Sequence, residues 1–360
     1  MAARERAVLV LEDGSSFWGW AVGAPGKVAG EVVFSTAMTG CQELLADPAL
    51  RGAIVTMTYP LVGSTGVSGG AEAPQAGGLV VRELCDVPSH WSARRSLAGF
   101  LRDHGVVAVE GIDTRALTRR LRERGSMRGV LATGEADVAQ LARDARELAD
   151  PAGRDLVREV TAGGAYLFAE GPGPRVTVVD CGVTRAALRL FAGRGCTVTV
   201  VPAGAGPEEV LATEPDGVVI SSGPGDPRSV PYLVETARRL AEARPLFGFG
   251  LGHQVIARAF GAETYRLPRG HRGGNYPVRE LPSGRVYITA QNHGFAVAEG
   301  SWNDPDLVVT HRNVHDGSVE GLAHRRLAVR TVQFRPEASP GPADAAHVVD
   351  DFLALLRRPA

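Results

Sequence analysis

The second half of the chain alternates between short apolar runs and amphipathic stretches. The runs have the length of buried strands, and the stretches repeat their apolar residues at helical spacing. We predict strands at 176–179, 197–201, 217–220 and 246–249, and helices at 183–193, 206–213, 230–241 and 251–260. This alternation indicates a mostly parallel sheet flanked by helices. Residues 263–332 are predicted to form short strands and turns, before a strand at 329–334 and a last helix near 343–357.

The first half has another pattern, in which short apolar runs are broken by Gly, Pro and Asp. It predicts strands at 8–11, 31–34, 53–57 and 78–81, and helices at 97–104, 114–124 and 134–149. A Gly- and Pro-rich interval separates the two halves. We therefore expect an α/β protein with a mixed α/β domain at 1–150, a linker at 151–174 and the parallel-sheet domain at 175–360.

Composition narrows the class of protein. The 360 residues are 44% apolar and 22% charged, which fits a globular chain with a sizeable core. The formal net charge of −1 gives no global field that favours nucleic acid or an anionic membrane as partner. Six arginines between Arg115 and Arg128 are interpreted as a solvated helix face or a surface for a partner protein rather than a nucleic-acid site.

Location and cofactors follow from what the sequence lacks. No apolar run reaches the roughly 20 residues that span a bilayer, and the N-terminus does not have the pattern of a signal peptide. The four cysteines do not have the spacing of metal ligands. We expect a cytoplasmic protein with no membrane partner, no metal and no cofactor.

The most informative segment runs from Pro245 to Gln254. An apolar run enters it, glycines at 248, 250 and 252 allow a sharp turn, and a helix-compatible run leaves it. This pattern is typical of the strand–turn–helix elbow that presents a catalytic nucleophile beside main-chain N–H groups. The residue at the turn is Gly250, which has no side chain that could attack a substrate.

Further blocks carry a resemblance to a known family. They lie at 11–14, 36–40, 78–84 and 111–118 in the first half and at 223–227, 252–254, 270–275, 291–295 and 333–341 in the second. On these blocks the whole chain resembles the small subunit of carbamoyl-phosphate synthetase, and its second half resembles the class I glutamine amidotransferases. The resemblance implies a glutaminase that passes ammonia to a large subunit, which makes carbamoyl phosphate from bicarbonate and ATP for arginine or pyrimidine synthesis.

The same resemblance locates the catalytic positions, and two of them have changed. The family has a nucleophilic Cys where this chain has Gly250, and a His base where it has Arg335. A guanidinium stays protonated and cannot act as a base near neutral pH. The third member of the triad, Glu337, is retained, and we expect it to form an ion pair with Arg335. In the glutamine pocket, Ala49 replaces a Ser of well-known members.

Other parts of the implied site are retained. The N–H of Leu251 and a glycine N–H of the Gly223-Pro-Gly225 turn are expected to form the oxyanion hole. Positions that contact glutamine in the family are matched by Gln254, Asn292, Gly294 and Phe295.

A relocated nucleophile is the first alternative to consider. Cys181 ends the first predicted strand of the second domain, at the edge where α/β sites gather. Catalytic geometry tolerates only about 1 Å of misplacement, so this replacement is disfavoured. His253 is interpreted as a packing residue of the helix after the elbow, and His293 as part of a tight Asn-His-Gly turn.

The leading hypothesis is a small-subunit-like protein with a dead glutaminase that docks a large subunit using free ammonia. One alternative is a regulatory module whose emptied pocket binds glutamine or another small ligand. Another is a repurposed enzyme that uses Arg335 as an anion clamp. Changes at nucleophile, base and pocket together favour natural divergence over designed inactivation, which would usually alter one residue conservatively.

Overall fold

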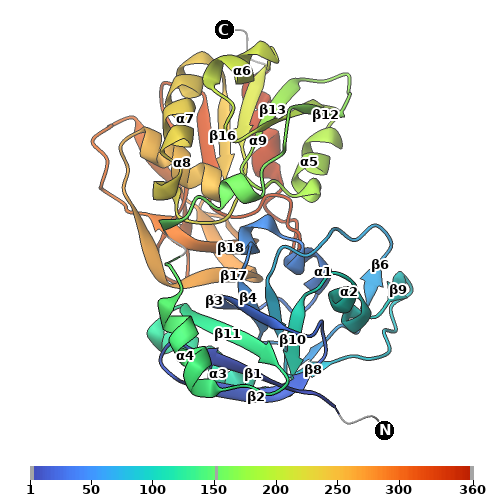
Figure 1. Ribbon diagram of the computed structural model, residues 1–360. Helices are drawn as coiled ribbons and strands as arrows, with labels where there is room; N and C mark the ends of the chain where they lie inside the picture. Colours follow the sequence, from blue (N-terminus) through green and yellow to red (C-terminus); the bar gives the residue numbers. More distant parts are fainter. Residues whose placement is uncertain (1–3, 151–152, 357–360) are drawn as a thin grey trace. The chain divides into compact units, whose positions relative to one another are not determined.

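The computed structural model describes residues 4–150 and 153–356 (Figure 1). Its contacts divide the chain into two compact units. The first comprises Met1–Pro151 together with Pro268–Gly273, and the second Ala152–Leu267 together with Gly274–Ala360. No helix in the described part of the chain is both long and apolar enough to cross a membrane.

The first unit is built on a closed barrel of seven strands in the order β1-β11-β3-β4-β7-β10-β2. The strands are β1 (Arg6–Leu11), β2 (Ser16–Ala21), β3 (Lys27–Ser35), β4 (Ile54–Met57), β7 (Gly78–Val80), β10 (Val107–Glu110) and β11 (Met127–Thr133). Closure leaves the barrel with no unpaired edge strand. The strands expected at 8–11, 31–34, 53–57 and 78–81 fall in β1, β3, β4 and β7.

Short helices and strands surround the barrel. The helices are α1 (Cys41–Leu45), η1 (Pro48–Leu50), α2 (Leu97–Asp103), α3 (Thr114–Arg124) and α4 (Val138–Glu147). The short strands are β5 (Leu61–Val62), β6 (Val67–Ser68), β8 (Glu83–Leu84) and β9 (Ala93–Arg95). Asp113 is the N-cap of α3, because its side chain accepts a hydrogen bond from the N–H of Ala116 at 2.9 Å. From the arginine run, Arg120 pairs with Asp13 and Arg128 with Glu12, so part of the run has a structural role.

The second unit contains a ten-stranded sheet in the order β12-β14-β13-β15-β16-β21-β20-β18-β17-β19. The strands are β12 (Tyr166–Ala169), β13 (Arg175–Asp180), β14 (Thr197–Pro202), β15 (Gly217–Ile220), β16 (Leu246–Phe249), β17 (Thr264–Glu280), β18 (Val286–Val297), β19 (Leu307–Asn313), β20 (Val319–His324) and β21 (Val329–Val332). The helices are η3 (Val157–Glu159), α5 (Arg185–Ala192), α6 (Pro207–Ala212), η4 (Pro227–Ser229), α7 (Pro231–Ala243), α8 (Leu251–Ala259) and α9 (His347–Leu356).

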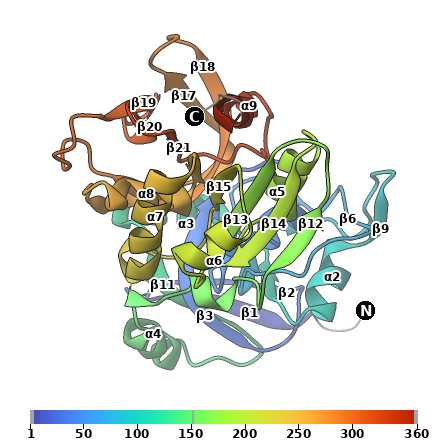
Figure 2. The same cartoon turned by 90° about the horizontal axis from the view of Figure 1, so that it is seen from above.

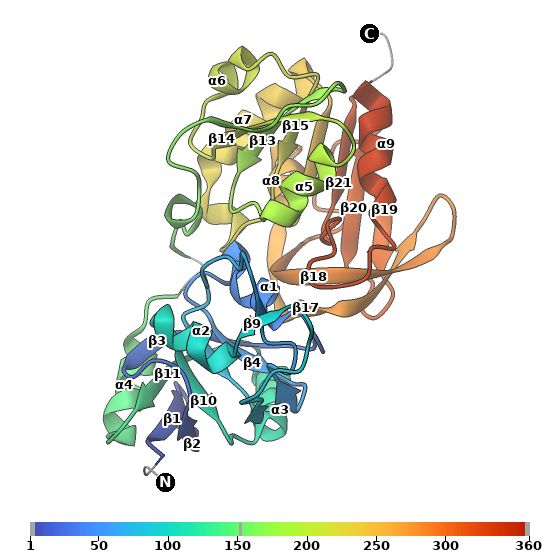
Figure 3. The same cartoon turned by 90° about the vertical axis from the view of Figure 1, so that its right-hand side faces the viewer.

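Five neighbouring strands, from β14 through β13, β15 and β16 to β21, are parallel, as the alternating pattern predicted. Their side chains alternate between two buried layers. On one face Val218, Ile220 and Leu246 pack with α7 and α8, and on the other Val219 and Phe247 pack with α5 and α9. The helices lie accordingly on opposite faces of the sheet (Figure 2; Figure 3). The predicted fold class is therefore confirmed.

Two expectations about local structure differ from what is observed. The prediction of short strands between 263 and 332 is wrong, because β17 has 17 residues and β18 has 12. Within the expected linker 151–174, residues 153–174 group with the second unit, where η3 forms and β12 pairs with β14. Long-range pairing outweighs the Gly and Pro content on which the local prediction rested.

A glycine fixes how closely α8 packs on the parallel sheet. A Cβ added to Gly252 would lie 2.0 Å from the carbonyl oxygen of Ile220 in β15. We therefore expect Gly252→Ala to lower the free energy of unfolding by about 3 kcal/mol or more, since the clash is with main chain that cannot turn away. Gly204→Ala is the matched control, because nothing lies within 4 Å of its added Cβ. Chemical denaturation measures both; equal stability of the two variants would contradict this packing argument.

Candidate functional site

The strand–turn–helix elbow expected around Gly250 is present. Strand β16 ends at Phe249, Gly250 has φ 57° and ψ −118°, and α8 begins at Leu251. The N–H of Gly250 donates to the carbonyl of Val332 in β21 at 3.1 Å. A positive φ disfavours residues with a Cβ, so this turn keeps the constrained backbone of a catalytic elbow without a side chain on it.

The space beside Gly250 is occupied by a neighbouring serine. A Cβ built on Gly250 would lie 2.8 Å from Cβ of Ser222 and 3.2 Å from its Cα. Ser222 follows β15 and is 3% exposed, and its hydroxyl has no hydrogen-bond partner among residues 4–150 and 153–356. The sequence analysis did not identify this serine. Its position directly before the Gly223 turn is the signal that could have identified it. A nucleophile restored at position 250 would have to displace it.

Arg335 and Glu337, which the family resemblance assigns to the base and orienting positions, form the ion pair that was expected. They follow β21, where a parallel register pairs Phe249 with Val332 and so places both chain segments at the same edge of the sheet. Nη1 of Arg335 lies 3.3 Å from Oε1 of Glu337, and the side chains are 4% and 1% exposed. The hydroxyl of Thr184 donates to the same carboxylate oxygen at 3.0 Å. Glu337 therefore holds a permanent cation, where a triad would need it to orient an imidazole.

The glycine turn lies next to the elbow, because β15 and β16 are neighbours. A Cβ on Gly223 would lie 2.1 Å from the carbonyl oxygen of Cys181, and Gly225 has φ 89°, so both positions require glycine. Leu251 opens α8, and first-turn amides have no partner inside their own helix. The turn and the start of the helix follow neighbouring strands, and their role as the two donors of an oxyanion hole stays a prediction.

The residues expected to contact glutamine are distributed over both units. In the second unit, the Gln254 amide nitrogen donates to the Phe295 carbonyl at 2.8 Å and to Oε1 of Gln333 at 2.9 Å. Ala49 belongs to the first unit, where it lies in η1 and its N–H is capped by Asp47. Asn292, Gly294 and Phe295 lie inside strand β18. The tight turn expected around His293 is therefore wrong; the segment is extended.

Neither Cys181 nor His253 has the environment of a nucleophile or a general base. Cys181 is completely buried, and burial raises the pKa of its thiol well above the ordinary value, which disfavours the thiolate. Burial lowers the pKa of His253 to about 3, and its Nδ1 lies 2.8 Å from Oγ1 of Thr331. The packing role expected for His253 agrees with this environment.

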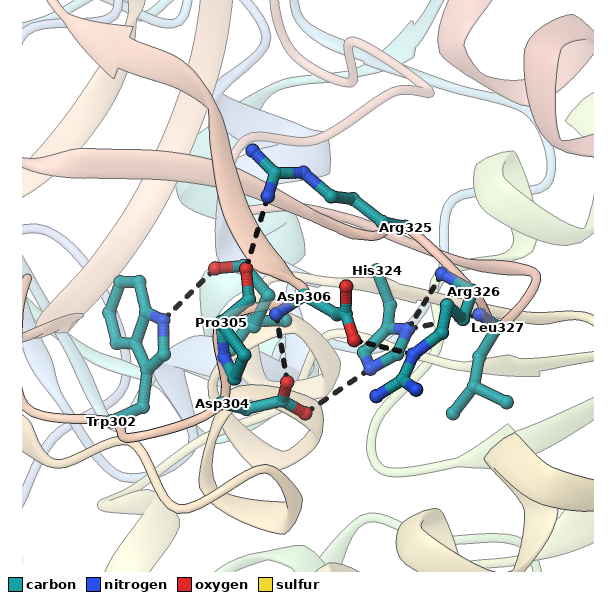
Figure 4. A network of polar contacts seen from close by, with 9 residues as sticks. Trp302, Asp304, Pro305, Asp306, His324, Arg325, Arg326 and Leu327 are labelled. Carbon is teal, nitrogen blue, oxygen red and sulfur yellow. Dashed lines mark hydrogen bonds and ion pairs between the residues drawn. The ribbon is translucent and has the colours of Figure 1, made fainter.

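A cluster of Asp304, Asp306 and His324 has the residue types of a metal site (Figure 4). However, Nδ1 of His324 accepts hydrogen bonds from the N–H groups of Arg326 and Leu327 at 3.2 and 2.9 Å. The ring proton is then on Nε2, which lies 3.2 Å from the Asp304 carboxylate. A metal on Nε2 would have to displace that proton while Nδ1 still faced two donors, so the cluster is a hydrogen-bonded one.

Comparison with known proteins decides the family. The model for the carbamoyl-phosphate synthase small chain, CPSase domain, matches residues 9–131, and the model for glutamine amidotransferase class-I matches residues 177–355. The carbamoyl phosphate synthase small chain of Symbiobacterium thermophilum is 52% identical over 97% of this chain and 98% of its own length. The chain belongs to the carbamoyl phosphate synthase small chain family.

Other members of this small chain family are similar over almost the whole length. The carbamoyl phosphate synthase small chains of Listeria innocua and Methanopyrus kandleri are each 46% identical, over 98% of this chain and over 97% and 99% of theirs. Among solved structures, a glutamine amidotransferase of Thermotoga maritima is similar with a TM-score of 0.38 and 17% identity, over 46% of this chain and 76% of its own. The small chains of these organisms confirm the family resemblance predicted from the sequence.

Proposed function

We propose that this chain is a carbamoyl phosphate synthase small chain that has lost its glutaminase activity and docks a synthetase large subunit that uses free ammonia. The observation that carries the proposal is the combination at the elbow. Gly250 has the positive φ of a strand–turn–helix elbow, and Arg335 and Glu337, which the resemblance assigns to base and orienting group, form a buried ion pair. The fold is retained, and the two groups that cleave an amide are absent.

Thioester chemistry needs both a thiolate and a proton acceptor within hydrogen-bond reach. Gly250 provides neither, and Arg335 has no lone pair for a proton. Cys181 is buried in its protonated form, and the Ser222 hydroxyl has no base bound to it in the described residues. These features support the absence of glutamine hydrolysis.

The anion-clamp alternative receives less support from the same contacts. Arg335 already forms an ion pair with Glu337. The carboxylate compensates the charge of the guanidinium, so Arg335 attracts a substrate anion less strongly. Docking is supported by the family itself, because the relatives are small chains and this chain matches 98% and 99% of the length of two of them.

The test is a paired assay of the reconstituted complex. The chain is mixed with a candidate large subunit, and carbamoyl phosphate is measured with ammonium and with glutamine as nitrogen source. We expect a stable complex, ammonium-dependent synthesis, and glutamine-dependent synthesis about a thousandfold lower or less, since nucleophile and base are both missing. A glutaminase-competent small chain with the same large subunit is the positive control.

The two parts of this proposal fail separately. Glutamate release by the complex, at a rate that increases with the concentration of this chain, would disprove the loss of glutaminase activity. A chain that stays monomeric with every large subunit tested would disprove docking.

A further inference from the structure

The second unit contains a cavity at the amino-terminal edge of its parallel strands. It has a volume of about 690 Å³, and its walls come from the segments that precede β15, β16 and β21 and from the end of α9. Gly250 follows the carboxyl end of β16, so this cavity is at the opposite edge of the sheet from the elbow. Its volume is within the range of roughly 300–1,000 Å³ that small-molecule sites have. We call it the arginine cavity.

The polar wall of the arginine cavity has an excess of positive charge. It contains four arginines and two carboxylates, namely Arg244, Arg325, Arg326, Arg330, Glu214 and Asp216. Arg175, which is outside the wall, binds both carboxylates: its guanidinium pairs with Glu214 at 3.0 Å, and its N–H donates to Asp216 at 2.7 Å. The cavity is therefore cationic, although the whole chain has a formal net charge of −1.

Three of these arginines keep most of their donors for a ligand. Arg244 donates to the carbonyls of Pro215 and Ala243, and Arg330 to that of Val329. Arg325 donates to the carbonyl of Pro305 at 3.3 Å. Within the described residues none of the three has a carboxylate partner. Each guanidinium has five N–H donors in a planar fork, and carbonyls use only one or two of them.

The hairpin between β20 and β21 forms part of this wall, and a network of polar contacts holds it in place (Figure 4). His324 accepts from the N–H groups of Arg326 and Leu327 and contacts Asp304 on its other side. Asp306 pairs with the Arg326 guanidinium. These contacts fix the backbone that carries Arg325, which reduces the entropy lost when an anion binds.

Apart from His324, the remaining wall is apolar. It is formed by Pro215, Pro245, Leu327, Leu355 and Leu356, together with alanines 243 and 328. An inorganic anion alone would fill little of this volume, whereas an organic body could pack on the prolines and leucines while its charged end meets the guanidiniums. Arginine matches phosphate oxygens with two parallel N–H···O bonds.

We propose that the arginine cavity binds a small phosphate-bearing organic molecule of nucleotide size, with its phosphates on Arg244, Arg325 and Arg330. This site is separate from the elbow and does not depend on whether the glutaminase is active.

The test is calorimetric titration of the full chain with ADP, adenosine and inorganic phosphate. We expect one ADP site, weaker binding of inorganic phosphate, no binding of adenosine, and a decrease in affinity between about 50 and 200 mM salt because exposed charges are screened. Arg244→Gln/Arg330→Gln should weaken ADP binding by about tenfold or more, since two charge-assisted contacts are lost.

Arg189→Gln on α5 is the matched control, an exposed arginine outside the cavity, and should bind ADP like the wild type. Circular dichroism verifies folding, and if the double variant does not fold, Arg325→Gln replaces it with an expected severalfold loss of affinity. The proposal is overturned if adenosine binds as well as ADP, if cavity variants and control bind equally, or if about 1 mM ADP gives no saturable heat.

Discussion

Glutamine hydrolysis should appear in the Gly250→Cys/Arg335→His variant and remain absent from each single variant. The first change supplies the sulfur and the second a proton acceptor beside Glu337, whose carboxylate already lies against position 335. A thiol without a base, or a base without a thiol, gives no route to the thioester. We expect the double variant to exceed each single variant by about a thousandfold in glutamate release, because residues that act as a unit are strongly non-additive.

The side chain of Ser222 limits the rate of glutamine hydrolysis that the double variant can regain. The restored Cβ at position 250 would lie 2.8 Å from the Ser222 Cβ, closer than two carbons can approach without movement. Adding Ser222→Gly should raise the rate of the double variant by about tenfold, because misplacement of a nucleophile costs large factors in rate. Ser222→Gly in the unmodified chain is the control and should stay inactive. Activity from Gly250→Cys alone would show that Arg335 does not occupy the position of the base.

Removing Glu337 should destabilise the second unit strongly. The Arg335 and Glu337 side chains are 4% and 1% exposed, so Glu337→Ala leaves a buried guanidinium without this partner. We expect the free energy of unfolding to fall by about 3–5 kcal/mol, the usual cost of breaking a buried ion pair from one side. Urea denaturation, followed by a signal from the second unit, measures the change.

Two further variants separate charge from packing. Arg335→Met/Glu337→Leu removes both charges and should recover most of the stability, because apolar residues of similar volume often replace a buried pair without loss. Thr184→Val removes the hydroxyl that donates to Glu337 and that also accepts from the N–H of Ala187 as the N-cap of α5, so it should cost about 2 kcal/mol. If Glu337→Ala unfolds like the wild type, the pair makes no net contribution to stability.

The two predictions address the same feature of the site from opposite directions. Arg335 cannot act as a base, and the same guanidinium balances the buried charge of Glu337, so one residue affects both the proposed chemistry and the stability of the fold. A His at position 335 would have to fill the space of the Arg335 side chain and also balance the charge of Glu337. This is why stability and glutaminase activity should be measured on the same variants.

The sequence by itself determined the parts of this protein that depend on local pattern or on side-chain identity. Alternating apolar runs and amphipathic stretches determined the parallel strands β13 to β16 and their helices. The chemistry of Gly250 and Arg335 needs no coordinates, because a missing side chain and a permanent cation are properties of the residues themselves.

Only the tertiary structure decided what depends on contacts between distant segments. β2 alternates between exposed and half-buried residues, so the sequence has no apolar run that predicts it. Its pairing with β1 and β10 is seen only in the closed barrel. Ser222 lies beside Gly250 because β15 and β16 are neighbours, although 28 positions separate the two residues. The arginine cavity likewise gathers Asp216, Arg244 and Arg325 from three strand starts. Such sites arise from packing, which brings together residues that lie far apart along the chain, so the sequence order does not predict their contact.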